Sequence, residues 1–430
     1  MKNRFVVFGL FIILLLNIHL SAFASSEKPD LYATSAALID LSNEHYLFKS
    51  NIQEPIAPGG LVKLMTAIVA IEHISDTSAT ITVSADAISS YDYSFGNMGI
   101  LANEDITYED LLHGLLIYDA GDAAEVLAST VVRSREKFII EMNNKAVEIG
   151  ALNTKFTNPT GFPDKNQYST VEDLYKITKY AMANPYLRDI MGKARYEMAP
   201  TNKYSKNRYL DNKNKFMSAT STDKYYTTRA KGVKNSYIDD DNCSLILNYE
   251  TDSVKFLTIV CESIYDGELN HAYEDTKKLL DYGLNYYSSV KIINEGDILA
   301  EVELTNAKNT DRLLLEATKD IYVNLPANYN PDKLETKVKL NEKIKAPLVK
   351  GQKLGEITIL YDGEVYASEE LLCPSEIKSN HLKGIFKKVA SFLTSPILLV
   401  SLGIMLIIFV WSILIFNKKK TYKLDKKINK

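Results

Sequence analysis

The sequence has few of the residues that bind metals or cross-link a chain. Its 430 residues include only three cysteines, Cys243, Cys261 and Cys373, and their spacing matches no metal-ligand motif. The six histidines are scattered and form no His-x-x-x-His pair. This composition argues against a metal enzyme, and the sequence contains no cofactor-binding motif. Cys243 and Cys261 lie in neighbouring predicted strands, where they either approach one another or remain buried free thiols.

The body of the chain lacks the excess positive charge that is typical of nucleic-acid-binding proteins. The formal net charge of the sequence is -4. Lys2 and Arg4 contribute +2 and residues 418–430 contribute +6, so residues 25–417 carry a net charge of -12. An acidic region of this kind argues against binding to nucleic acid or anionic lipid through net charge.

Long hydrophobic runs occur near both ends of the sequence. A basic start, an apolar run from Phe5 to Leu16 and the small-residue pattern Ala22-Phe23-Ala24 are typical of a secretory signal peptide, which we place at residues 1–24. An uncleaved anchor is the alternative, but the run is short and a cleavage pattern follows it. The sequence therefore predicts that the protein is exported.

The second hydrophobic run extends from Ile397 to Phe416 and holds no charge. It is about long enough to cross a bilayer, and lysines follow it at once. We therefore expect a transmembrane helix over 396–416 and a basic cytoplasmic tail over 417–430, with the bulk of a single-pass cell-membrane protein outside. Apolar residues at helical spacing among lysines predict an amphipathic juxtamembrane segment over 381–394.

The pattern of expected elements changes near residue 290. Before it, helical and strand-like segments mix: 61–71 is apolar on nearly every face, as in a buried helix, and Thr107 to Asp110 forms a capping-box pattern ahead of another helix. After it, short alternating segments and the hairpin signal Asp362-Gly363 predict a small all-β domain over 291–373. Further helices are expected over 136–149, from 170 to before 185, and over 270–287, and strands over 32–39, 46–48, 243–249 and 254–261.

The segment that precedes the predicted buried helix reads Pro58-Gly59-Gly60-Leu61-Val62-Lys63. It resembles the Ser-x-x-Lys motif of the serine-type D-alanyl-D-alanine carboxypeptidases, the low-molecular-mass penicillin-binding proteins. In that motif the serine and lysine share one helix face, and the lysine takes the proton of the serine. Lys63 is at the lysine position, but Gly60 is at the position of the nucleophile. The resemblance thus implies an acyl-transfer site without its nucleophile.

The resemblance covers about residues 30–375. Segments at 63–67, 109–112, 122–124, 138–143, 153–161 and 168–174 match the family in order and spacing. The fold that it implies is an α+β domain of the β-lactamase/transpeptidase type over 30–288. That domain has an antiparallel sheet with helices and a helical subdomain, and the small β domain follows it.

Two further motifs of the family are altered in this chain. The family has Ser-x-Asn before Asp-Ala-Ala, where the serine relays protons and the asparagine holds substrate, but here Asp119 and Gly121 stand at those positions. The family also has Lys-Thr-Gly on a strand that lines the cleft, and here Lys234 is kept while Asn235 and Ser236 replace the other two residues. Changes in all three motifs favour drift or repurposing over a single engineered mutation or a sequencing error.

Asp119 is expected to face Lys63 if the family arrangement holds. A carboxylate near a lysine favours the charged ammonium, which is a poor base, so we predict an Asp119–Lys63 salt bridge that closes the former site. The alternative is that Asp119 points to solvent. A relocated nucleophile is disfavoured, since Thr66 lies about 600° around the helix from Gly60 and Ser236 lacks a partner base of the usual kind.

We therefore interpret the chain as a membrane-anchored, extracytoplasmic homologue of these carboxypeptidases that is linked to peptidoglycan and is catalytically inactive. It is expected to bind a peptidoglycan stem peptide or a cell-wall protein, where Lys234 attracts a carboxylate. Two alternatives remain at this point. One is an active serine-type carboxypeptidase that trims stem peptides by a non-standard route, and the other is a purely structural module with a filled cleft.

Overall fold

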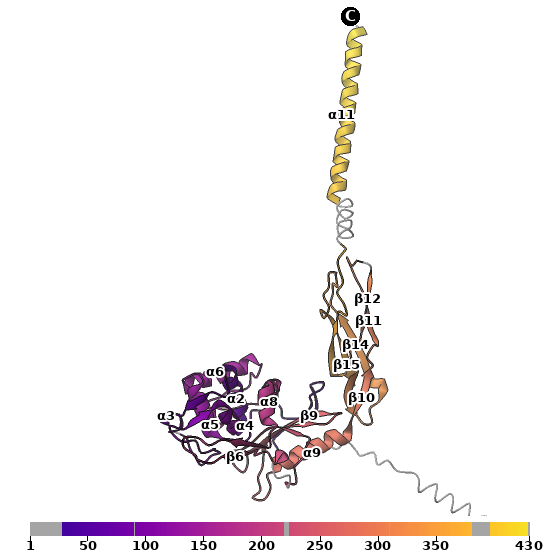
Figure 1. Cartoon of the computed structure of the whole chain (residues 1–430). Helices are drawn as coiled ribbons and strands as arrows, with labels where there is room; N and C mark the ends of the chain where they lie inside the picture. Colours follow the sequence, from indigo (N-terminus) through magenta and orange to yellow (C-terminus); the bar gives the residue numbers. More distant parts are fainter. Residues whose placement is uncertain (1–27, 90, 219–222, 309, 381–395, 429–430) are drawn as a thin grey trace, which may run out of the picture. The chain divides into compact units, whose positions relative to one another are not determined.

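A computed structural model describes residues 28–89, 91–218, 223–308, 310–380 and 396–428 (Figure 1). The predicted signal peptide over 1–24 and the predicted amphipathic segment over 381–394 lie outside these residues. The chain forms two compact units. One comprises Met1–Val290 with Val323–Asn330, and the other comprises Lys291–Tyr322 with Pro331–Lys430.

A five-stranded antiparallel sheet forms the centre of the first unit. Its order is β2-β1-β9-β8-β7, so β1 and β9, the first and last strands of this sheet in the sequence, lie side by side. Every residue of the strand β1 is buried. Because successive side chains in a strand point to opposite faces, β1 sends Ala37 and Ile39 into one hydrophobic core and Ala36 and Leu38 into another. The strands are β1 Ser35–Asp40, β2 His45–Ser50, β7 Ala230–Tyr237, β8 Cys243–Glu250 and β9 Lys255–Ser263.

Helices cover both faces of this sheet. The helix α9 (His271–Tyr286) contributes Ala272, Tyr273, Leu279 and Leu280 to one core. The helices on the other face form the larger core, and α2, α4, α5 and α8 lie together in Figure 1. These helices are α2 Val62–His73, α3 Ala85–Ile88, α4 Tyr108–Leu116, α5 Gly121–Thr130, α6 Arg135–Glu148, α7 Val171–Ala183 and α8 Pro185–Met191.

The helix α2 confirms the prediction of a buried helix. Its residues from Val62 to Ala70 are all buried, including the charged Lys63. A short 3-10 turn, η1 (Gly59–Leu61), leads into it and carries Gly60. The predicted capping box at α4 is also present: the Thr107 hydroxyl accepts from the Asp110 N–H at 3.0 Å, and the Asp110 carboxylate accepts from the Thr107 N–H at 3.3 Å.

Short elements complete the first unit, and strands dominate the second. The all-β character predicted after residue 290 is observed. The remaining elements are β3 Thr80–Thr82 with β4 Asp105–Thr107, β5 Arg195–Met198 with β6 Arg208–Asp211, η2 Lys215–Met217, β10 Tyr287–Ile293 with β13 Ile321–Pro326, β11 Ile298–Glu303 with β12 Arg312–Glu316, η3 Pro331–Lys333, and the sheet β14 Leu334–Leu340, β15 Lys353–Tyr361, β16 Glu364–Leu372.

The C-terminal helix α11 extends over Pro396–Ile428. It does not end near residue 416, where the apolar run ends, because the lysines that follow are good helix formers. Within the described part of the chain, no helix combines the length and the apolar character that a membrane span requires. The structure therefore does not support the predicted transmembrane helix over 396–416.

Candidate functional site

Gly60 and Lys63 are placed by a tight junction of backbone segments before α2. Gly59 has φ of 49°, in the left-handed region that favours glycine. A Cβ on Gly161, whose φ is 85°, would overlap the carbonyl of Gly59. The segment of Gly161 is held by the Asn158 side chain, whose Oδ1 accepts from the Gly161 N–H at 2.8 Å. Glycine is therefore needed both at Gly59, in the turn before α2, and at Gly161, in the segment packed against that turn.

Asp119 lies in the connection between α4 and α5, with φ of 66°. A short polar residue such as aspartate tolerates this left-handed conformation. The connection is fixed by Asp122, a fully buried residue whose carboxylate accepts from the N–H groups of Met98 and Ile100. Burial raises the pKa of Asp122, although these hydrogen bonds act against the rise. The anchored backbone holds the Asp119 side chain over the start of α2.

Asp119 joins the two lysines of the family motifs. Its Oδ1 lies 3.0 Å from Lys63 Nζ and 2.5 Å from Lys234 Nζ. The predicted Asp119–Lys63 salt bridge is thus confirmed, and the alternative of a solvent-facing Asp119 is wrong. The sequence motifs did not link Lys234 to this pair, although Lys234 is the other lysine that matches a motif of the family. We call Asp119, Lys63 and Lys234 the carboxylate bridge.

The carboxylate bridge sits in a largely dehydrated place. Lys63 is 5% exposed, Lys234 is 1% exposed, and the Asp119 side chain is 22% exposed. Burial alone would raise the pKa of Asp119, but the charges and hydrogen bonds of Lys234 and Lys63 outweigh burial and lower it. Burial lowers the pKa of Lys234 to about 8, although Asp119 acts in the opposite direction. The ionised carboxylate therefore compensates two ammonium groups that form no salt bridge with any other acidic side chain among the residues the structure describes.

Ser236 lies directly beside Gly60. Its Oγ accepts a hydrogen bond from the Gly60 N–H at 2.7 Å, and the residue is 2% exposed. A Cβ placed on Gly60 would lie 3.0 Å from Asp119 Oδ1 and 3.4 Å from Ser236 Oγ. The space that a serine side chain needs at position 60 is therefore bounded closely by a carboxylate and a hydroxyl.

Gly121 and Asn235 take no part in lining the former cleft. A Cβ on Gly121 would lie 2.7 Å from Cε2 of Tyr91, so the Tyr91 ring fills the space of a side chain at this position. Asn235 is half-buried on β7, and its carbonyl accepts from Lys234 Nζ at 3.1 Å. Of the altered motif positions, only Gly60 and Asp119 border the remaining cavity.

An aromatic cluster, Tyr91, Phe95 and Phe162, lines the cavity beside Gly60. The ring centroids of Tyr91 and Phe162 lie 5.3 Å apart, and those of Phe95 and Phe162 lie 4.5 Å apart. The Tyr91 hydroxyl donates to the Gly96 carbonyl at 2.5 Å, which ties the ring to its own loop. Sequence reasoning missed these residues because none belongs to a motif. The one available signal was Gly121 itself: a glycine at a position where the family has asparagine leaves space that a large neighbouring side chain can fill.

The cavity that remains is small. Its volume is about 40 Å³, and Gly60, Lys63, Asp119 and the aromatic cluster are among its lining residues. A single water molecule needs roughly 10–15 Å³ of such volume. The cavity therefore has room for a few water molecules.

The structure gives no support for metal or thiol chemistry in the part of the chain that it describes. No group of three or more histidine, cysteine, aspartate or glutamate side chains is arranged there to hold a metal ion. Cys243, Cys261 and Cys373 are buried free thiols, so Cys243 and Cys261 do not pair. Burial raises the pKa of both the Cys243 and the Cys261 thiols to about 12, which makes them poor nucleophiles.

Comparison with known proteins gives matches along most of the chain. A family profile described as D-alanyl-D-alanine carboxypeptidase matches residues 22–263, and one described as the C-terminal domain of penicillin-binding protein 5 matches residues 287–379. The D-alanyl-D-alanine carboxypeptidase DacF of Bacillus subtilis is 26% identical over 350 residues, covering 80% of this chain and 86% of that protein. The DacA protein of Haemophilus influenzae is 24% identical over 389 residues, covering 87% and 94%.

Solved structures share the fold. A peptidoglycan synthesis regulatory factor (PBP3) from Streptococcus pneumoniae aligns with a TM-score of 0.69 at 19% identity. The alignment covers 81% of this chain and 100% of that chain. Penicillin-binding protein 5 from Haemophilus influenzae aligns with a TM-score of 0.67 at 21% identity, covering 82% and 99%. At these identities the likeness concerns the fold alone.

Proposed function

Because the chain belongs to the D-alanyl-D-alanine carboxypeptidase family, we propose that it is a member that has lost catalysis and acts at the cell wall by binding. The family acts on peptidoglycan, and this chain keeps the fold of the family. It differs from the family at the positions of the motifs that carry the reaction.

The carboxylate bridge is the observation that carries the proposal. Acyl transfer of this type needs a nucleophilic hydroxyl and a lysine that accepts its proton. Gly60 supplies no hydroxyl, and Lys63 Nζ donates to the Asp119 carboxylate at 3.0 Å. Lys234, the group that would attract a substrate carboxylate, is occupied by the same internal carboxylate at 2.5 Å. One side chain thus takes up both cationic positions of the former site.

An active enzyme with a relocated nucleophile is the alternative that one contact favours. Ser236 Oγ lies within 2.7 Å of the Gly60 N–H, close to the place of the lost hydroxyl. In the described part of the chain, no lysine or histidine side chain forms a hydrogen bond with Ser236 Oγ. The hydroxyl is also 2% exposed, so a substrate carbonyl has no open path to it.

We further propose that the protein is exported by its N-terminal segment and held at the cell membrane in a single pass, with peptidoglycan stem peptide or a cell-wall protein as its partner. The support comes from the sequence: an apolar run with a cleavage pattern at the start, and an uncharged run from Ile397 to Phe416 before a cluster of lysines. Carbonate extraction of membranes tests the anchor. The full chain should stay with the membrane, and a chain that ends at residue 395 should be released.

Release of D-alanine from a purified muropeptide tests the proposed loss of catalysis. The full chain should release none above the rate of buffer, while a serine-containing relative such as the Bacillus subtilis DacF protein serves as the positive control. Release by the natural chain that is abolished by Ser236→Ala would instead establish the alternative.

A further inference from the structure

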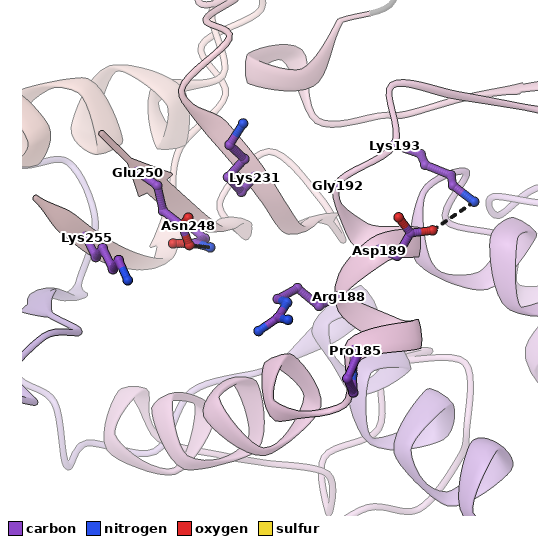
Figure 2. A pocket seen from close by; sticks show the side chains of 9 residues that line it. All are labelled: Pro185, Arg188, Asp189, Gly192, Lys193, Lys231, Asn248, Glu250 and Lys255. Carbon is purple, nitrogen blue, oxygen red and sulfur yellow. Dashed lines mark hydrogen bonds and ion pairs between the residues drawn. The ribbon is translucent and has the colours of Figure 1, made fainter. Parts of the chain in front are cut away.

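A second pocket in the first unit lies away from the former cleft, and the two share no lining residue. Its volume is about 600 Å³, within the range of about 300–1,000 Å³ typical of small-molecule sites. It is formed where α8 meets the ends of β7, β8 and β9. Figure 2 shows its lining side chains: Pro185, Arg188, Asp189, Gly192, Lys193, Lys231, Asn248, Glu250 and Lys255.

Cationic groups dominate the pocket although the body of the protein is acidic. Four of the lining residues are basic and two are acidic. One acidic group, Asp189, is already paired with Lys193 at 3.1 Å. In the described part of the chain Arg188 and Lys255 form no salt bridge, and the ammonium of Lys231 donates to the Thr228 carbonyl at 3.2 Å. Three cations are thus left without a carboxylate partner around one space.

Asn248 and Glu250 form a polar pair at the wall of the pocket. Asn248 is 1% exposed, and its Nδ2 donates to the Glu250 carboxylate at 2.9 Å. Its Oδ1 is buried and has no hydrogen-bond partner among the described residues. A buried polar atom without a partner is costly and rare in native proteins. In Figure 2 the Arg188 side chain lies across the space from Asn248 and Glu250, while Asp189 turns toward Lys193.

We propose that this pocket binds an oxyanion ligand, one that carries a carboxylate or phosphate next to a hydroxyl or amide N–H group. The oxyanion would be held by Arg188, Lys231 and Lys255, since charge-assisted hydrogen bonds to such groups are the strong ones. The neighbouring N–H or O–H group would donate to the Glu250 carboxylate, which lines the pocket and is oriented by Asn248 Nδ2. The inference names a ligand surface for the protein, and it does not depend on whether the former cleft is catalytically inert.

Isothermal titration calorimetry on the detergent-solubilised full chain tests this inference. The probes are N-acetylmuramic acid, which supplies a carboxylate, glycerol 3-phosphate, which supplies a phosphate, and uncharged N-acetylglucosamine. At least one anion should bind, more weakly at high salt, and the neutral sugar should not. Which anion binds identifies the source of the oxyanion.

The double variant Arg188→Gln with Lys255→Gln should weaken anion binding at least about tenfold, since a charge-assisted hydrogen bond contributes about that factor or more. Both side chains are exposed, so the variant is expected to fold, which circular dichroism checks. Lys137→Gln with Lys155→Gln, at exposed positions outside the pocket, is the matched control and should bind normally.

Three results would overturn the inference: no anion binds at millimolar concentration, the neutral sugar binds as well as the anions, or the pocket variant binds like the control variant. Penicillin labelling of the same samples reports on the cleft and is unaffected by any of these results, so failure of the pocket and failure of the proposed loss of catalysis are distinguishable.

Discussion

Asp119 and Lys63 form an ion pair of 3.0 Å beside Gly60 at the start of α2. The same carboxylate is shared by Lys234. Asp119 thus links two buried lysines, so its charge should matter for the stability of the fold.

The charge of Asp119 should be important for stability. Asp119→Asn keeps the shape and the tolerance of positive φ but leaves Lys63 and Lys234 buried without an anion. Removing one partner of a buried ion pair costs about 3–5 kcal/mol, so the free energy of unfolding in urea should fall by about that amount.

The matched control for this variant is Glu44→Gln. Glu44 also has positive φ, 57°, but it pairs with Lys179 in an exposed salt bridge in which the two side chains are 54% and 51% exposed. Its loss should cost about 0–1 kcal/mol. Equal costs for the two variants would contradict a special role of the carboxylate bridge.

The contribution of Asp119 should depend on pH in the acid range. Its pKa is lowered from 3.8 in the folded protein, so its stabilisation is fully present above that unfolded value and is lost as pH falls through the lower folded pKa. Below about pH 4, the difference in melting temperature between the natural chain and Asp119→Asn should shrink as the pH falls. A difference that grows as the pH falls below about 4 would refute this assignment.

Tyr91 and Gly121 should depend on one another. Gly121→Asn restores the family residue but places its Cβ 2.7 Å from Cε2 of Tyr91, and such overpacking costs about 1–3 kcal/mol. In the Tyr91→Ala background the same change should cost clearly less, which a double-mutant cycle from urea unfolding measures.

Gly192→Asn serves as the control for Gly121→Asn. The nearest neighbour of a Cβ at Gly192 is the Arg188 carbonyl oxygen at 3.5 Å, an ordinary contact. It should change the stability little in either background. Additive costs for Gly121→Asn and Tyr91→Ala would mean that the tyrosine does not occupy the space of the lost side chain.

The Ser236 hydroxyl should act as the acceptor for the Gly60 backbone N–H and not as a nucleophile. Ser236→Ala removes the partner of the Gly60 N–H, and a typical hydrogen bond contributes about 0.5–1.5 kcal/mol. Urea unfolding should show a loss of this size, whereas the exposed Ser253→Ala should show almost none. An unchanged stability for Ser236→Ala would leave the 2.7 Å contact without energetic meaning.

Local signals in the sequence predicted much of the scaffold. The apolar run after Gly60 predicted α2, and the spacing of Thr107 and Asp110 predicted the cap of α4. The Asp119–Lys63 pair was predictable because both residues occupy motif positions. In each case the information lies in one short segment or in a recognised pair of segments.

The remaining parts of the site depend on contacts between distant segments that no periodicity encodes. Lys234 reaches Asp119 across 115 residues of sequence. Tyr91 fills the space beside Gly121 from a loop with no regular pattern, and the buried Asn248 of the second pocket reads in sequence as an ordinary strand residue. Such contacts depend on how the elements pack in three dimensions, which local sequence does not specify.

We expect no covalent intermediate to form beside Gly60, and penicillin acylation measured by intact mass is the decisive measurement. The full chain and its Gly60→Ser variant should both show no added mass, since Asp119 still holds Lys63 in an ion pair. The Bacillus subtilis DacF protein is the positive control. A penicillin adduct on the natural chain would contradict the account, and full acylation of Gly60→Ser alone would show that the other changes do not close the site.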